Sequence, residues 1–238
     1  MLLTRTTLLG LAIALLSVTP GVTEYRETAV GNGGSVEGRV YFDGDYPPPE
    51  SYRPSRDAGT CGVRVPSEKF VVDGDSKGLA NAIVRLEGVS SGKAFPSADG
   101  VISQLECRYR PHILVQQPGE DLKIVNQDPI LHNVHAYRED ETLFNMAQPF
   151  QGQETRQPLD DEGLVRIACD VHDWMEAWVL VIDNPYFAIT DEQGQFSISA
   201  VPPGRYQITM WQEMLGTATK TVEVTAGAAA SIDFAIGK

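Results

Sequence analysis

The chain has 238 residues, of which 42% are hydrophobic; this excludes a disordered protein and allows one large domain or two small ones. Its 19 Lys and Arg residues against 32 Asp and Glu residues give a formal net charge of -13. Such a chain repels the phosphates of nucleic acid, so we expect no nucleic-acid binding and a partner with a basic surface. The other interpretation of the acidic excess is that it only keeps an exported protein soluble.

The N-terminal residues 1–22 differ in composition from the rest of the chain. Arg5 precedes the apolar run 8–18, and Pro20-Gly21 ends that run. The run is shorter than the roughly 20 residues of a membrane-spanning helix, so it predicts a signal peptide and export to the periplasm or cell envelope. No Ala-x-Ala cleavage site is present, and an uncleaved anchor is the alternative. After cleavage we expect no membrane span.

The next predicted element is a strand over residues 36–42, where Val36, Val40 and Phe42 alternate with polar residues. The prolines at 47–49 cannot donate to a ladder and end this part of the chain. A second strand is predicted over residues 80–88. Between them, residues 50–78 are rich in charged and turn-forming residues, so we expect a long irregular segment, the excursion, that leaves the sheet.

Three cysteines in an exported protein leave one without a disulfide partner. Cys169 lies among candidate metal ligands, so we expect a disulfide between Cys61 and Cys107 that pins the excursion. In the chain-entropy model, closing a loop of about 46 residues stabilises the fold by about 4 kcal/mol.

Strands are predicted at 110–115 and 122–126, on either side of a turn at 118–121. The second strand runs into Asp128-Pro129, where the chain must bend because proline lacks a donor and the preceding residue avoids helix. His132 lies just past that bend and His135 three residues later. His112 is expected to be structural, and residues 142–155 to be a polar and aromatic crossing.

A strand over 163–169 ends at Cys169, and His172 and Met175 follow at every third position. These are the soft and borderline ligands that copper prefers. One upstream imidazole completes a set of two His, one Cys and one Met, which indicates an electron-transfer copper centre. Zinc is the competing ion, but it has little use for a thioether. We expect Trp174 and Trp178 to limit access of water.

The remaining predicted strands are 177–182, 191–198, 201–211, 221–224 and 231–236. No long helical period follows residue 22, so the predicted fold class is all-β. We find no Ser-His-Asp set, nucleotide loop or paired carboxylates, and we therefore expect no enzymatic activity.

The segment from about 107 to 183 resembles the cupredoxins, in particular the plastocyanin and amicyanin group of blue copper proteins. The matching features are the Pro118-Gly119 turn, the approach from Asn126 to Leu131-His132-Asn133-Val134, and the short Cys-x-x-His-x-x-Met spacing. The resemblance implies a Greek-key β-sandwich that holds one type 1 copper per chain.

The ligands that this resemblance implies are His132, Cys169, His172 and Met175. It favours His132 over His135, which stays an alternative ligand or a supporting group. Asn133 would then steady the ligand loop.

The outer parts of the chain, 34–40 with 82–86 and 190–196 with 201–206, resemble the carboxypeptidase regulatory-like or transthyretin-like β-sandwiches. The implied organisation is a signal peptide at 1–22, a discontinuous sandwich at 35–100 and 184–238, and a cupredoxin domain inserted at 101–183. The whole chain resembles bacterial exported plastocyanin-like proteins labelled as methylamine-utilisation proteins.

The expected function is one-electron transfer between redox partners, such as a c-type cytochrome or a dehydrogenase. A first alternative is a module for copper storage, delivery or sensing. A second is a non-redox envelope interaction domain with a structural metal site.

Overall fold

The computed structural model describes residues 25–45, 48–96 and 100–237, so the predicted signal peptide at 1–22 lies outside the described residues. Helix in the described part is limited to α1 (Ala58–Cys61), and the all-β prediction is confirmed. None of the described helix is long and apolar enough to cross a membrane.

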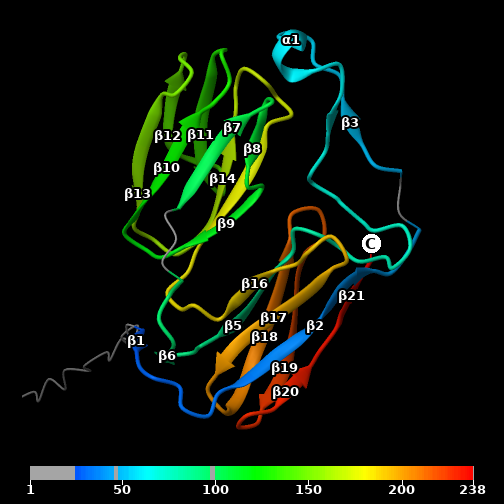
Figure 1. Cartoon of the computed structure of the whole chain (residues 1–238), viewed down its shortest axis with the longest axis vertical. Coiled ribbons are helices and arrows are strands. Elements are labelled where there is room, and N and C mark those ends of the chain that lie inside the picture. Colours follow the sequence, from blue (N-terminus) through cyan, green and yellow to red (C-terminus); the bar gives the residue numbers. More distant parts are fainter. Residues whose placement is uncertain (1–24, 46–47, 97–99, 238) are drawn as a thin grey trace, which may run out of the picture.

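The first sandwich consists of two sheets that enclose one hydrophobic core (Figure 1). One sheet has the order β13-β10-β7-β8, with β7 (Val101–Leu105), β8 (Arg108–Arg110), β10 (Glu120–Asn126) and β13 (Glu154–Leu159). The other has the order β12-β11-β14-β15-β9, with β9 (Ile113–Gln116), β11 (His132–Arg138), β12 (Glu141–Gln148), β14 (Gly163–Ala168) and β15 (Glu176–Val181). Alternating residues such as Val165, Ile167, Ala177 and Val179 point into this core.

The second sandwich is formed by segments on both sides of the first in the sequence. Its first sheet has the order β16-β5-β18-β19, with β5 (Ile83–Glu87), β16 (Phe187–Ile189), β18 (Gly204–Gln212) and β19 (Gly216–Val224). In its second sheet, β2 (Gly34–Phe42) pairs with β17 (Gln195–Val201), β20 (Ala229–Ser231) and β21 (Phe234–Ile236). A small two-stranded sheet joins β1 (Arg26–Glu27) to β6 (Ser91–Gly92).

The two sandwiches meet through the outer faces of two sheets. Ile113, Leu180 and Ile182 from the first sandwich pack with Ile83 of the second in a small core of their own. Trp178 and Trp211 cross this interface with ring centroids 5.1 Å apart. Because residues alternate along β15, Trp178 and Leu180 face the second sandwich while Ala177 and Val179 face the inner core.

Residues 50–69, which we call the strap, leave the second sandwich and lie against the first (Figure 1). The strap contains β3 (Ser51–Tyr52), α1 and β4 (Val65–Pro66), and β3 pairs with β4. Cys61 forms the predicted disulfide with Cys107, and Val65 is only 2% exposed in the core of the first sandwich. The predicted boundaries put these residues in the discontinuous sandwich, but their packing partners belong to the inserted one.

One segment that was not predicted to form strands differs from the structure. In the expected polar crossing 142–155, residues 142–148 lie in β12, which pairs with β11 along the edge of its sheet, and residues 154–155 begin β13. One face of β12 is exposed, and the other becomes more buried from Thr142 through Phe144 and Met146 to Gln148. Apolar and polar residues occur on both faces of this edge strand, so its sequence shows no clear alternation.

Candidate metal centre

Three donor side chains converge at one end of the first sandwich. His132 is the first residue of β11, Cys169 follows the last residue of β14, and His172 lies in the loop that leads into β15. The Nδ1 atoms of His132 and His172 are 3.0 Å apart, and Cys169 Sγ lies 3.9 Å from Nδ1 of His172. The exposed fractions are 0% for both histidines and 4% for Cys169. The structure therefore gathers three predicted ligands in a buried group.

The ligand loop between β14 and β15 is closed by its own backbone. Met175 N–H donates to the carbonyl of His172 at 3.0 Å, and Cys169 N–H donates to the carbonyl of Met175 at 3.3 Å. The Met175 side chain is 2% exposed and packs in the same core as Cys169. The tight loop thus brings Met175, the fourth predicted ligand, back beside Cys169 at the end of β14.

The donor separations fit a single cation. Bonds of roughly 2.0 Å to nitrogen and 2.3 Å to sulfur place neighbouring donors about 3–4 Å apart. The ring-nitrogen and sulfur atoms of His132, Cys169 and His172 all lie within 4.8 Å of one another. Two imidazoles, a thiol and a buried thioether are a donor set of the kind that copper prefers.

Two carboxylates fix the orientation of the two imidazoles. Nε2 of His132 lies 2.9 Å from Oδ2 of Asp128, and Nε2 of His172 lies 3.0 Å from Oδ2 of Asp57. An ionised carboxylate only accepts hydrogen bonds, so each pair favours the tautomer with hydrogen on Nε2 and a lone pair on Nδ1. Both free lone pairs then point toward Cys169.

The surroundings of Cys169 favour the thiolate. Burial opposes ionisation, but the neighbouring side chains of His132 and His172 and a backbone hydrogen bond from Asn133 outweigh it and lower the pKa of Cys169 to about 6. The thiolate is the form of cysteine that binds metals.

Asn133 joins β11 to the ligand loop. Its Oδ1 accepts a hydrogen bond from the backbone N–H of Asp170 at 2.6 Å, and its Nδ2 donates to Oδ2 of Asp170 at 3.0 Å. Asp170 directly follows Cys169, so these contacts hold the position of the thiol. Asn133, which the resemblance implied would steady the ligand loop, is thus in contact with that loop.

His135 does not join the three converging donors. Its Nδ1 lies 3.0 Å from Oδ1 of Asp170, its Nε2 lies 2.9 Å from Oγ1 of Thr142, and its ring stacks on Tyr137. Successive side chains of β11 point to opposite faces of the sheet, so His132 and His135, three residues apart, lie on opposite faces.

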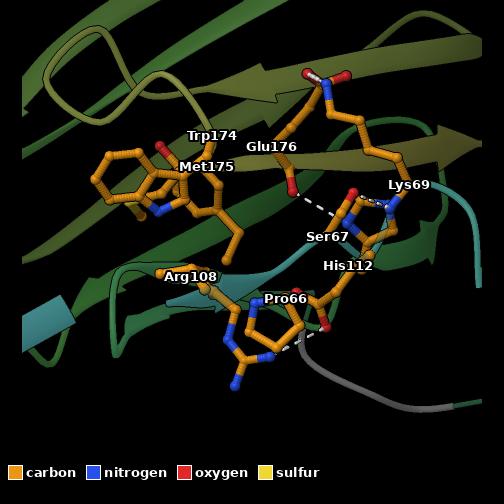
Figure 2. Close-up of a pocket in the computed structure, with 11 residues that line it drawn as sticks. Pro66, Ser67, Lys69, Arg108, His112, Trp174, Met175 and Glu176 are labelled. Atoms are coloured by element: carbon orange, nitrogen blue, oxygen red, sulfur yellow. Dashed lines mark hydrogen bonds and ion pairs between the residues drawn. The ribbon is translucent and has the colours of Figure 1, made fainter. Parts of the chain in front are cut away.

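The strap covers the outer side of the centre. Trp174 donates its indole N–H to the carbonyl of Cys107 at 3.0 Å, and its ring centroid lies 5.2 Å from that of His172. A cavity of about 10 Å³, room for about one water molecule, separates residues 65–69 from Met175 and Trp174 (Figure 2). Beside this cavity, Nζ of Lys69 forms an ion pair with Oε2 of Glu176 at 2.8 Å.

Trp178, expected near the centre, and His112, expected to be structural, both lie at the interface between the sandwiches. Trp178 donates to Oε2 of Glu213 at 3.0 Å and packs on Trp211, so the expectation that it shields the centre is wrong. His112, expected to be structural, has Nε2 2.5 Å from Oε1 of Glu213 and Nδ1 3.1 Å from the carbonyl of Glu176. This second contact reaches the residue after Met175 (Figure 2).

Sequence reasoning missed three residues that support the centre: Asp57, Asp128 and Tyr109. Asp128 had a local signal, since it lies four residues before His132 at the bend, where its carboxylate also accepts from Cys107 N–H at 2.8 Å. Tyr109 is 1% exposed and donates to the carbonyl of Asn133 at 2.6 Å. Asp57 had no signal, because 115 positions separate it from His172.

Comparison with known proteins gives partial likenesses. Residues 162–232 match the family model described as polysaccharide lyase family 4, domain II, a stretch that runs from the first sandwich into the second. No curated protein matches. The carboxypeptidase regulatory-like resemblance finds no counterpart among these matches.

Several solved structures are similar to part of the chain. A purple cupredoxin from Nitrosopumilus maritimus is 22% identical, covers 35% of this chain and 100% of its own, and has a TM-score of 0.33. Amicyanin from Paracoccus versutus is 19% identical over 37% of this chain and 84% of its own, with a TM-score of 0.33. A copper-containing nitrite reductase from Thermus scotoductus is 16% identical over 39% of this chain and 24% of its own, with a TM-score of 0.32.

Proposed function

We propose that this protein is an exported type 1 copper protein that carries single electrons between redox partners. The observation that supports this most is the convergence of the Nδ1 atoms of His132 and His172 with Sγ of Cys169 in a buried group. Copper bound there would supply the Cu(I)/Cu(II) couple. Carrying electrons requires no further catalytic group, and we propose no enzymatic role.

The residues around the ligands serve to keep this donor set in one arrangement. Asp57 and Asp128 orient the imidazoles, and Asn133 together with the closed backbone of the ligand loop holds the thiol. A centre whose ligands need little movement between two oxidation states exchanges electrons with little reorganisation. In this proposal Met175 would supply a thioether ligand, which favours copper over zinc.

The disulfide supports export, and the net charge supports a partner that is attracted electrostatically. A disulfide such as Cys61–Cys107 persists in oxidising compartments, which include the periplasm. The net charge of -13 favours encounter with a basic surface, such as that of a c-type cytochrome or a dehydrogenase.

A second candidate function, copper storage or delivery, is favoured by one specific observation. His172 has an exposed fraction of 0%, and its outer nitrogen contacts Asp57 of the strap. A redox partner therefore cannot touch this imidazole and receive an electron through it. Slow release of a stored ion does not require such contact.

The rate of electron exchange distinguishes the two functions. We would mix copper-loaded, reduced protein with an oxidised basic c-type cytochrome and follow the cytochrome spectrum by stopped flow at several ionic strengths. Electron carriage predicts fast bimolecular oxidation that slows as salt screens the opposite charges. Oxidation over minutes or longer, independent of salt, would support storage or delivery instead.

A further inference from the structure

The disulfide lies against both imidazoles of the metal centre. The sulfur atoms of Cys61 and Cys107 and one ring nitrogen of His172 all lie within 4.8 Å of one another. Sγ of Cys107 also lies within the same distance of a ring nitrogen of His132 and a carboxylate oxygen of Asp128. Two sulfur atoms outside the proposed copper ligands are therefore next to those ligands, and both cysteines are buried.

Other contacts hold the strap in place besides the disulfide. Val65 is buried in the core of the first sandwich, and Tyr52 packs against that core. Lys69 pairs with Glu176 at 2.8 Å, and Asp57 bonds His172 at 3.0 Å. Because these contacts come from both sides of Cys61, breaking the S–S bond leaves its sulfur close to that of Cys107.

The two nitrogens of His172 face different neighbours. Nδ1 points to His132 and Cys169, while Nε2 points to Asp57 in the strap. The side of the ring that faces the strap is thus free of the ligands assigned to copper. A donor group on that side can take an ion without removing Cys169 or Met175 from the first one.

We infer that reduction of the Cys61–Cys107 disulfide creates a second soft-metal site, adjacent to the first and formed by the Cys61 and Cys107 thiolates beside His172. An external dithiol supplies two electrons and two protons, the S–S bond breaks, and the dithiol becomes a disulfide. Each thiol then gives up its proton as it binds the ion. Paired thiolates select monovalent soft cations such as Cu(I).

The disulfide therefore sets the metal capacity of the chain. The oxidised chain has one site for a monovalent soft ion, and the reduced chain has two. The two thiolates of the second site are not among the ligands assigned to copper, so its occupancy can be measured without reference to copper redox activity.

Native mass spectrometry of the full chain with Ag(I), a soft ion that does not change oxidation state here, tests this inference. The chain is reduced with dithiothreitol, freed of it anaerobically, and checked for three free thiols by alkylation. We expect one bound ion before reduction and two after it. One bound ion after reduction, or loss of the near-ultraviolet circular dichroism of the folded chain, overturns the inference.

Two variants test the second site independently of the proposed copper centre. The double variant Cys61→Ser/Cys107→Ser should bind one ion with or without dithiol, and a second ion there would contradict the assignment. Cys169→Ser should bind no ion when oxidised and one when reduced. If the oxidised wild type binds none, the proposed copper centre fails, while a reduced Cys169→Ser chain that binds one still supports the second site.

Discussion

The carboxylate of Asp57 contacts Nε2 of His172 at 3.0 Å, although 115 positions separate the two residues. Asp57 lies in the strap just before α1, whereas His172 lies in the ligand loop of the first sandwich. The contact holds one imidazole in the tautomer that presents Nδ1 to the centre and also covers its outer edge.

Removing this carboxylate should weaken metal binding. Asp57 has φ 54°, which glycine adopts without strain, and its side chain makes no capping bond to α1. Asp57→Gly should therefore keep the strap conformation and lower copper affinity about 10–100-fold, the usual effect of losing a group that orients a ligand. Competition titration against a chelator measures the change.

Asp140→Gly is the matched control, because it removes the same charge from an exposed position in the turn between β11 and β12. Its affinity should equal that of the wild type. Equal affinities for all three proteins would mean that Asp57 does not position His172.

The two histidines of β11 should respond differently to substitution. His132→Ala removes one of three converging donors and should abolish the copper-thiolate absorption band. His135→Ala should retain the band at full stoichiometry, because this ring bonds Asp170 and Thr142 and lies outside that group. Titration of each variant with Cu(II), followed by visible absorption, makes the comparison. Loss of the band in His135→Ala with retention in His132→Ala would exchange their roles.

The disulfide should contribute strongly to stability. Cys61 and Cys107 close a loop with a sequence separation of 46, which in the chain-entropy model corresponds to about 4 kcal/mol. Cys61→Ser/Cys107→Ser should lower the free energy of unfolding by about that amount in urea denaturation of the metal-free protein. Wild type kept under reductant should match the double variant. A loss below about 1 kcal/mol would show that the strap contacts alone fix this loop.

The interface between the sandwiches should make stability depend on pH. Burial favours neutral His112, but its hydrogen bond and ion pair with Glu213, together with the charge of Glu68, outweigh burial and raise its pKa. A raised folded-state pKa gives stability that is fully present below the unfolded value of 6.5 and is lost as pH rises through the folded value.

We expect the free energy of unfolding of the wild type to fall above pH 6.5, and His112→Gln to reduce that slope. Urea denaturation across this range measures both. The same slope in both proteins would exclude His112 as its source. Arg205→Gln, an exposed substitution on β18, controls for the loss of one positive charge.

Local spacing made much of this centre predictable. Cys169, His172 and Met175 share one loop, so their proximity follows from the chain itself, whereas His132 was favoured over His135 only by the resemblance of His132-Asn133-Val134 to a family's ligand segment. The disulfide followed from the odd number of cysteines. Alternation along β2 and β14, and an apolar run on both faces of β15, predicted strands that carry the cores.

What could not be predicted depends on contacts between distant segments. Asp57 reaches His172 only because the strap folds back over the first sandwich, and a single acid in a charged stretch carries no signal of that. Trp178 is close to the ligands in sequence, but alternation along β15 turns it toward Trp211. The edge strand β12 carries Leu143 on its exposed face and Gln148 on its buried face, so its sequence lacks a clear alternation of apolar and polar residues.

The most direct test of the central claim is the absorption and paramagnetic resonance spectrum of the oxidised full chain titrated with Cu(II), beside that of Cys169→Ser. The proposed centre predicts an intense visible copper-thiolate band that saturates at one copper per chain and is absent from Cys169→Ser. A colourless wild-type complex, or the same spectrum in both proteins, would contradict a type 1 copper centre formed by His132, Cys169, His172 and Met175.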